Sequence, residues 1–513
     1  MRFFYFSLSK MKYSSKDFLC KRLLPFLFLS FMVIVFYAVS LKVISANREE
    51  PVLAFKSQWL SDQSLEISFG ELFYFYVNKY PPKLVFDFDG FKLPFILFPQ
   101  HGPLSSIPPY LMYKIGSEYS VSLMRLTGVI VGLLILLILL KDSLTLSFLL
   151  YTNAFLLFVF SYTSLFWYVC MLLFCVLYIK SLNGLNKYFI FSISALGAAS
   201  HVRFPLFSLI FALVFWHPRR VFWTLLGNLL GLSPYLILSL IHKSIQIDRR
   251  SLEILFAPPS DITKFVLNYF SSGSFNLLHE ITNSVKSFSY LFFSFTPFSD
   301  LGILKTENSG ILRFLAAAFF IFVFFSALRY NIRYFFSLVL YILLTPLSNP
   351  SGLFNFTKMP WQFLLILPVF YSLILNANRF FIYLIIFSQI LFSFLVLRNI
   401  AHSKTQFSRS EVREVVNFLE SGNIQEVLNI GLFSSIPLES AGKINTVEAL
   451  YFFYTKPQNY VFREISKFDY IIVSQETDDL IGKILVRMFE PIFTTSGGSI
   501  KVYKKKPNFY LQR

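Results

Sequence analysis

The feature that most restricts the fold of this chain is a succession of long apolar runs. The first covers residues 24–45, and others follow at short intervals as far as residue 397. Because a helix rises 1.5 Å per residue, about 20 apolar residues cross the hydrocarbon core of a membrane. No water is available there, so each run must bond its own backbone N–H and C=O groups as a helix. The runs therefore predict a helical membrane protein.

Composition agrees with this prediction. Hydrophobic residues make up 55% of the 513 positions and charged residues only 14%, a balance unlike that of soluble domains. We predict a mainly α fold, a polytopic membrane helical bundle of about 11 spans. The runs are residues 24–45, 121–140, 144–160, 164–179, 188–200, 204–216, 221–241, 311–328, 334–347, 361–375 and 380–397.

Several runs are shorter than the usual span of roughly 17 to 25 residues. The short runs lie in pairs around Tyr162 and around His201. Helices that do not match the membrane thickness tilt or kink. We therefore expect tilted spans at these places, or one pair that forms a single broken helix.

The distribution of Lys and Arg predicts the orientation, because short cytoplasmic loops carry an excess of both. Residues 1–23 form a basic cytoplasmic tail, and the first run is typical of a signal anchor. Cleavage after Ala46 is less favoured, since the run exceeds the roughly 7 to 15 residues of a signal-peptide core. We expect a bacterial inner-membrane protein with its C-terminus outside the cytoplasm. The basic residues of the inner loops are then Lys141, Lys180, Lys187, Arg219, Arg220, Arg329, Arg333 and Arg379.

The soluble regions are expected on one face, the extracytoplasmic one. They are two outer loops, residues 46–120 and 242–310, within a transmembrane module of residues 24–397, and a C-terminal α/β domain, residues 398–513. In that domain a capping box, Ser408 to Glu411, predicts a helix. The stretches EVLNIG and FDYIIVS predict strands, and GGSIKVYKKK predicts an edge strand. In the second loop, SFSYLFFSFTPF is too short to cross and is expected to lie in the membrane interface.

Charge and cysteine content limit the other partners. The net charge is +18, but Lys and Arg are scattered and form no dense stripe, so nucleic acid is not an expected partner. We interpret these residues as topology signals and contacts with membrane lipids. The cysteines Cys20, Cys170 and Cys175 form neither a CxxC metal site nor a disulfide framework. The chain also lacks the glycine-rich motifs of nucleotide sites.

The first outer loop carries the residues with the most chemical character. Asp62 follows soon after the first run, and Asp87 and Asp89 flank Phe88 further along. Later features of the loop, as far as the second run, are His101, Gly102-Pro103-Leu104, Gly116 and Arg125-Leu126.

This order of features resembles the GT-C superfamily of membrane glycosyltransferases, in the branch of protein mannosyltransferases and lipid A aminoarabinose transferases. The shared features are an acid in a long outer loop, a Pro-Leu turn, a glycine, and Arg-Leu opening the second span. The likeness continues through the short third and fourth spans to FTKMPWQFLLILPVF and the C-terminal α/β region. The chain departs from the family at Asp62-Gln63, where many members have Asp-Glu, and at Gly102-Pro103, where they have two prolines.

The resemblance implies transfer of a sugar from a polyprenyl-phosphate carrier to a glycan, lipid or protein acceptor, with inversion at the anomeric carbon. A carboxylate must take the proton of the acceptor hydroxyl as its oxygen attacks. Fixed cations must hold the departing lipid phosphate, whose charge grows in the transition state. Asp62 is the expected base, and Asp87 and Asp89 are weaker catalytic candidates.

Cations at the outer ends of spans are the candidates for binding the donor phosphate. Arg203 ranks first, because a guanidinium contacts phosphate through two N–H groups and is costly at the hydrocarbon edge without a partner. Lys358 ranks second. The weaker candidates are His201, Arg125, Arg249 and Arg250.

Each of these residues also has a structural interpretation. Asp62 is a suitable helix N-cap, and Asp87 and Asp89 fit a solvated turn. His101 is more typical of a structural hydrogen bonder, because no second ligand lies at metal spacing. Arg203 could instead anchor a helix end by snorkelling.

Two further questions stay open on the sequence. A divalent metal is not favoured, because the first loop lacks a compact carboxylate cluster. The alternative functions are a lipid-linked saccharide flippase or transporter, and a polysaccharide polymerase or ligase. Against a transporter, the chain shows no internal duplication.

Overall fold

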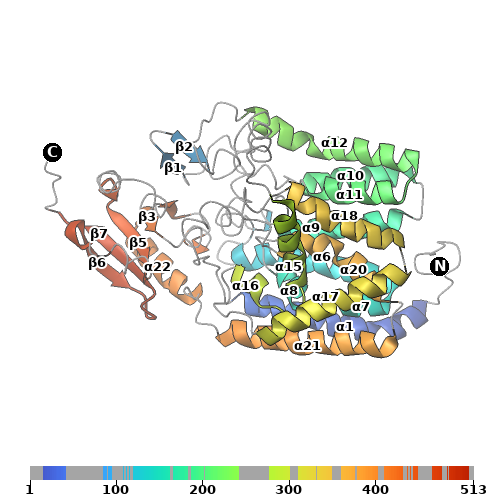
Figure 1. Ribbon diagram of the computed structural model, residues 1–513. Coiled ribbons are helices and arrows are strands. Elements are labelled where there is room, and N and C mark those ends of the chain that lie inside the picture. The colour runs from blue at the N-terminus through green and yellow to red at the C-terminus, as the bar shows by residue number, and fades with distance from the viewer. Residues whose placement is uncertain are drawn as a thin grey trace.

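The chain folds into a large helical body with a small sheet beyond one end of it, as the computed structural model in Figure 1 shows. Apart from isolated positions, the described residues are 15–41, 85–88, 91–94, 120–161, 166–182, 186–201, 203–241, 276–300, 310–330, 332–348, 360–375, 378–402, 409–430, 443–448, 465–475 and 485–507.

Each apolar run predicted from the sequence is mainly helical over its described residues. The helices of the body are α1 (Ser15–Ser40), α6 (Ser120–Asp142), α7 (Leu144–Tyr151), α8 (Ala154–Ser161), α9 (Phe166–Ser181), α10 (Lys187–Ser200), α11 (Phe204–Val214), α12 (Pro218–Ile241), α15 (Leu277–Ser289), α16 (Thr296–Asp300), α17 (Gly310–Tyr330), α18 (Ile332–Ser348), η6 (Pro360–Ile366), α20 (Leu367–Ile374) and α21 (Arg379–His402).

By length and hydropathy, three described helical segments could each cross a membrane: Arg22–Ser40, Ser122–Asp142 and Arg379–His402. The pair α7 and α8 adds a fourth if the two count as one span, and several apolar helices are shorter. Large apolar side chains such as Leu229, Phe325 and Phe387 are exposed, as a lipid environment allows. The protein is therefore a multi-pass membrane protein, while the number of about 11 spans stays a prediction.

One predicted span is broken, but the break does not lie between two paired runs. It lies inside the third run, residues 144–160, which forms α7 and α8. Helices α7 and α8 meet at an angle of 76°. The hydroxyl of Thr152 is 2.7 Å from the Phe148 carbonyl, which closes α7. The Asn153 Oδ1 atom accepts the Leu156 N–H at 3.0 Å, which starts α8. Two polar residues that favour helix ends thus interrupt an apolar run.

The apolar stretch at residues 287–298 packs inside the protein, while its expected place in the membrane interface stays a prediction. Phe288, Leu291, Phe292 and Phe298 are at most 3% exposed and belong to the main hydrophobic core. The Asn153 Nδ2 atom donates to the Leu291 carbonyl at 2.9 Å. The non-helical part of this stretch is therefore surrounded by protein, which satisfies one of its backbone carbonyl groups.

Glycines allow helix backbones to approach closely in two places. A Cβ atom on Gly227 of α12 would lie 2.8 Å from the Cβ of Ser194 on α10, and one on Gly231 would collide with the Ala195 carbonyl. On α6, a Cβ on Gly128 would meet the Phe160 carbonyl of α8. Small residues at four-residue spacing let membrane helices pack by close backbone contact.

The C-terminal region contains helix α22 (Arg409–Ser421) and a five-stranded mixed sheet. The strands are β3 (Glu426–Ile430), β4 (Asn445–Glu448), β5 (Tyr470–Ser474), β6 (Phe489–Thr494) and β7 (Ile500–Lys505), in the order β4-β3-β5-β7-β6. Strands β4, β3 and β5 are parallel, and β7 pairs antiparallel with both β5 and β6. The predicted strands are present, but β7 is interior because β6 pairs along its outer side.

Helix α22 lies where the capping box predicts a helix, although Ser408 falls outside the described residues. The Glu411 carboxylate accepts the Thr495 hydroxyl at 2.9 Å and the Ser499 N–H at 3.3 Å. It therefore ties the helix to the β6–β7 turn. The small core of this region, including Val412 and Ile472, is a separate cluster from that of the helical body.

Candidate functional site

Two of the predicted phosphate-binding residues occupy the turn between α10 and α11. Helix α10 ends at His201, which is extended (φ −163°, ψ 140°), and Arg203 takes the N-cap position of α11. Pro205 lies in the first turn, where its fixed φ favours a helix start. Gly197 leaves room for the ring of Phe204, which would collide with any Cβ there. The sequence HVRFP thus produces a tight turn that holds a cation at a helix N-terminus.

His201 is buried and fixed by its neighbours. Its side chain is 1% exposed, and its Nδ1 atom lies 3.1 Å from the Arg203 backbone N–H. Because Nδ1 accepts that hydrogen bond, the proton of the neutral ring is on Nε2, which can donate. The ring also stacks on Tyr168 of α9, with centroids 5.9 Å apart and planes at 26°.

Arg203 is only partly buried, and its guanidinium has no hydrogen bond or ion pair within the described part of the chain. It lies close enough to Tyr341 of α18 for an electrostatic interaction. Tyr341 is itself fixed against Phe207 of α11, with ring centroids 6.3 Å apart. A cation that faces the N-terminus of a helix creates a positive region, which suits a phosphate.

Arg125 has a different environment. Its side chain is fully buried, and Nη1 donates to the Ser40 carbonyl at 2.6 Å. The Ser40 hydroxyl lies 3.1 Å from the Ser161 carbonyl, and the Tyr37 hydroxyl donates to the Ser122 carbonyl at 2.7 Å. Arg125 thus joins the ends of α1, α6 and α8, immediately before the long first loop. Its role in binding the donor stays a prediction.

The other predicted site residues cannot be placed beside this turn. Asp62, Asp89, His101, Lys358, Arg249 and Arg250 lie outside the described residues. Asp87 belongs to strand β1 (Val85–Phe88), where it pairs in register with Lys92 of β2 (Phe91–Pro94). This hairpin contacts β4 of the C-terminal sheet.

The sequence interpretation did not single out one buried acid. Glu280 on α15 is 3% exposed, and it is the one buried acid in the described part of the helical body. A buried ionisable side chain is costly unless it is paired, so Glu280 is a candidate for a structural or a functional role. The signal was present in LLHEITNSVKSFS as a polar run in an apolar chain, but helical spacing alone does not show which face is buried.

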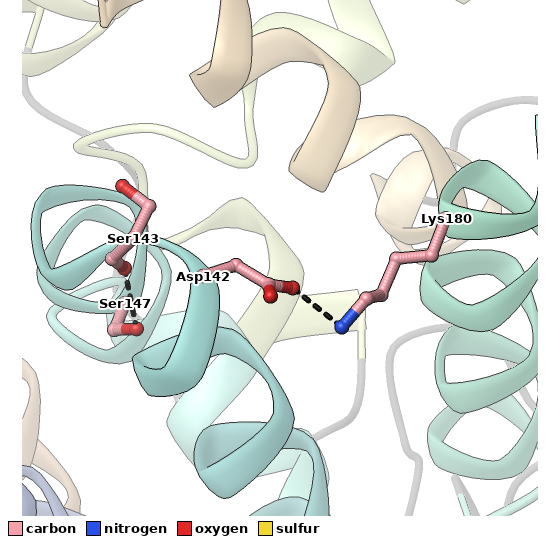
Figure 2. A network of polar contacts seen from close by, with 4 residues as sticks. All are labelled: Asp142, Ser143, Ser147 and Lys180. Carbon is pink, nitrogen blue, oxygen red and sulfur yellow. Dashed lines mark hydrogen bonds and ion pairs between the residues drawn. The ribbon is translucent and has the colours of Figure 1, made fainter. Parts of the chain in front are cut away.

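The basic residues of the expected inner face form structural contacts. Figure 2 shows Lys180, in the last turn of α9, pointing at Asp142 at the end of α6, with an Nζ to Oδ2 distance of 2.6 Å. In the same view the Ser147 hydroxyl donates to the Ser143 carbonyl at 2.9 Å. The Arg220 Nη2 atom donates to the Leu182 carbonyl at 2.6 Å. These contacts of Lys180 and Arg220 join helix ends.

Among the described residues, no three His, Cys, Asp or Glu side chains gather closely enough to hold a metal ion. The turn between α10 and α11 offers a cation and a buried imidazole. Such groups can bind a phosphate and hydroxyl groups.

Comparison with known proteins gives a result at the level of the fold. No protein-family model and no curated protein sequence match this chain. Among solved structures, ArnT from Cupriavidus metallidurans bound to undecaprenyl phosphate matches with a TM-score of 0.54 and 10% identity, over 94% of this chain and 98% of ArnT. The chain therefore shares its fold with ArnT, and this agrees with the resemblance drawn from the sequence at the level of the fold.

Proposed function

We propose that this protein is a membrane glycosyltransferase that moves a sugar from a polyprenyl-phosphate carrier to an acceptor on the extracytoplasmic face of a bacterial inner membrane. The observation that carries the proposal is the match to ArnT along almost the whole chain, because that structure contains undecaprenyl phosphate. The turn at Arg203 supplies the charge that a lipid phosphate needs.

The proposed reaction is a direct displacement. The oxygen of an acceptor hydroxyl attacks the anomeric carbon, and its proton passes to the Asp62 carboxylate. The bond between that carbon and the phosphate oxygen breaks, and the lipid phosphate leaves with the electron pair. The configuration at the anomeric carbon inverts.

Arg203 has two roles in this reaction. Its guanidinium binds the phosphate of the donor and stabilises the charge that develops as the phosphate leaves. The backbone at the start of α11 adds the positive end of a helix dipole. His201 supports this position of Arg203, because its Nδ1 atom accepts the Arg203 backbone N–H. Lys358 and Arg249 are further candidates for the same phosphate.

The first test uses the purified full chain in lipid nanodiscs with undecaprenyl-phosphate sugars and an extract of surface glycolipids as acceptors. Asp62→Asn and Arg203→Gln are each expected to reduce transfer about 10²-fold, because a base or a phosphate ligand is lost. Arg219→Gln is the matched control, since Arg219 is an exposed arginine at the opposite end of the bundle and should leave transfer unchanged.

Full activity of Asp62→Asn would remove the proposed base. Movement of the carrier across the membrane without any sugar transfer would instead show a flippase.

A further inference from the structure

Basic side chains gather where α11 ends and α12 begins, at the end of the bundle that the sequence predicts in the cytoplasm. Phe215 is the C-cap of α11, and Pro218 opens α12. The Val221 N–H donates to the His217 carbonyl at 3.1 Å, which is the first hydrogen bond of α12. Phe215 also packs against Tyr334 of α18, with ring centroids 4.9 Å apart. These contacts bring the first turn of α12 beside the first turn of α18.

Two arginines from these first turns lie near one another. The guanidinium carbon of Arg333, on α18, is 5.9 Å from the centre of the Phe215 ring. Arg220, on α12, lies close enough to Arg333 for their like charges to interact. The N-terminus of a helix is its positive end, where an anion is favoured and a cation is disfavoured. Both the repulsion between the arginines and the helix dipoles therefore favour a bound anion.

The contacts of Arg220 are all with neutral groups. Its side chain is 7% exposed, Nη1 donates to the Phe215 carbonyl, and Nη2 donates to the Leu182 carbonyl at 2.6 Å. The Nε atom of Arg220 and the Nδ1 atom of His217 are buried without a hydrogen-bond partner among the described residues. Carbonyl groups do not neutralise a guanidinium, and a buried charge without a counter-charge is costly.

The sequence supplies few acids to balance these charges. The predicted inner loops contain a single acid, Asp142, and the N-terminal tail adds Asp17. Asp142 is already paired with Lys180 (Figure 2). Within the described ranges, neither Arg220 nor Arg333 forms an ion pair. A counter-ion from outside the chain is therefore the simplest way to neutralise this pair of arginines.

Exposed apolar side chains lie next to the same turn. Trp216, directly before it, is 65% exposed, and Phe222, directly after Arg220 and Val221, is 57% exposed. Trp is enriched at the membrane interface, and exposed apolar groups of a membrane helix meet acyl chains. A ligand that fits both kinds of surface carries a negative group on an apolar tail.

We propose that Arg220, Arg333 and the N-terminus of α12 bind the headgroup phosphate of an anionic phospholipid. Arg333 is exposed and contacts the phosphate, while the charge of Arg220 and the positive end of α12 strengthen the attraction. Basic pockets between membrane helices on the cytoplasmic side suit anionic headgroups. Arg203 lies at the opposite end of α11, so this site is separate from the proposed donor site and does not depend on the proposed function.

Topology alone explains less of this arrangement. The positive-inside rule requires basic residues in short inner loops but no packing of one against another. Snorkelling takes a basic head into water. Arg220 instead lies buried between two carbonyls and beside a second arginine.

Binding of defined lipids to the delipidated full chain in detergent tests the proposal. Native mass spectrometry gives the Kd for phosphatidylglycerol and for phosphatidylcholine, which has a phosphate but no net charge. We expect the wild-type chain to bind phosphatidylglycerol about tenfold more tightly, because two arginines face a net negative charge. Arg333→Gln should weaken that binding about fivefold, since one charge is lost, and should leave binding of phosphatidylcholine unchanged. An excess of inorganic phosphate should not displace phosphatidylglycerol.

Arg379→Gln is the matched control. Arg379 is also an exposed arginine in the first turn of an apolar helix, α21, in a predicted inner loop, but it is not part of this cluster. Its substitution should leave the Kd unchanged. Arg333→Lys keeps the charge and should keep the Kd within about twofold of the wild-type value. The Arg333 side chain forms no hydrogen bond with the described residues, so Arg333→Gln should fold and keep the wild-type Tm without lipid.

Three results would overturn the inference. One is equal affinity of the wild-type chain for the two lipids, and another is an equal loss of affinity in Arg333→Gln and Arg379→Gln, because charge would then act without a site. Displacement of phosphatidylglycerol by inorganic phosphate would show a site for a free anion instead of a lipid. The experiment contains no sugar donor, so each of these results leaves the transferase proposal standing.

Discussion

Asn153 is a buried polar residue that joins several segments of the largely apolar helical body by hydrogen bonds. Its Nδ2 atom donates to the Leu291 carbonyl and, at 3.2 Å, to the Tyr371 hydroxyl, while Oδ1 caps α8. Gln389 of α21 is bonded to both Tyr371 and Thr152. Segments far apart in the chain therefore meet at a single hydrogen-bonded cluster. A polar side chain left without a hydrogen bond in a dry interior costs free energy. The cluster therefore favours the one arrangement of these segments in which all its members are paired.

We expect Asn153→Ala to destabilise the protein more than Asn186→Ala does. Asn186 caps α10 through the same kind of bond to Phe189 N, but it is exposed. Loss of a cap costs about 1 kcal/mol at either site. The buried bonds of Asn153 should add about 1–3 kcal/mol. Thermal unfolding in detergent gives the comparison, and equal losses of stability in the two variants would contradict the role of the cluster.

At the scale of elements, close backbone contact decides how α10 and α12 pack. Lipid tails are as apolar as the helix surfaces, so burial from water does not drive this pairing. Gly227 and Gly231 instead let α12 approach Ser194 and Ala195 directly. The turn that holds Arg203 follows α10, so this packing also supports the position of the proposed phosphate site.

Gly231→Ala should therefore weaken the protein by about 1–3 kcal/mol, because the added methyl group would overlap the Ala195 carbonyl. The control is Gly310→Ala at the start of α17, where an added Cβ meets nothing within 4 Å. Thermal unfolding is again the measurement. A destabilisation by Gly310→Ala as large as that by Gly231→Ala would show that helix propensity or the unfolded state, not packing, is responsible.

At the scale of the whole molecule, the predicted orientation depends on which residues share an end of the bundle. Figure 1 shows the C-terminal sheet beyond the end of the bundle opposite to that where α1 begins. Lys180 and Arg220, expected in the cytoplasm, lie at ends of α9 and α12. The proposed function requires the sheet and the Arg203 turn to face outside, where the lipid-linked sugar is used.

Cysteine labelling tests this orientation. Cys170 and Cys175 are buried, so a chain with Cys20→Ser offers a low background. An impermeant maleimide added to intact spheroplasts should label Glu426→Cys, which is exposed on β3, and should not label Lys187→Cys, which is exposed at the start of α10. Permeabilised cells serve as the control in which both react. The reverse pattern would place the sheet in the cytoplasm and contradict the proposed site of transfer.

The sequence alone determined the helical membrane class, the position of each apolar helix and the strands β3, β5 and β7, because hydrophobic runs and periodic patterns depend on local spacing. It also made Arg203 and His201 candidates for the site, since a cation between two apolar runs is conspicuous, and their role in binding phosphate stays a prediction. Tertiary structure decided what depends on contacts between distant residues. The third run is interrupted at Thr152, and residues 287–298 pack in the core. Strand β6 pairs with β7 on its outer side, and Glu280 and Ser284 are buried. Burial is set by the helices that pack around a residue, and no local pattern specifies those neighbours.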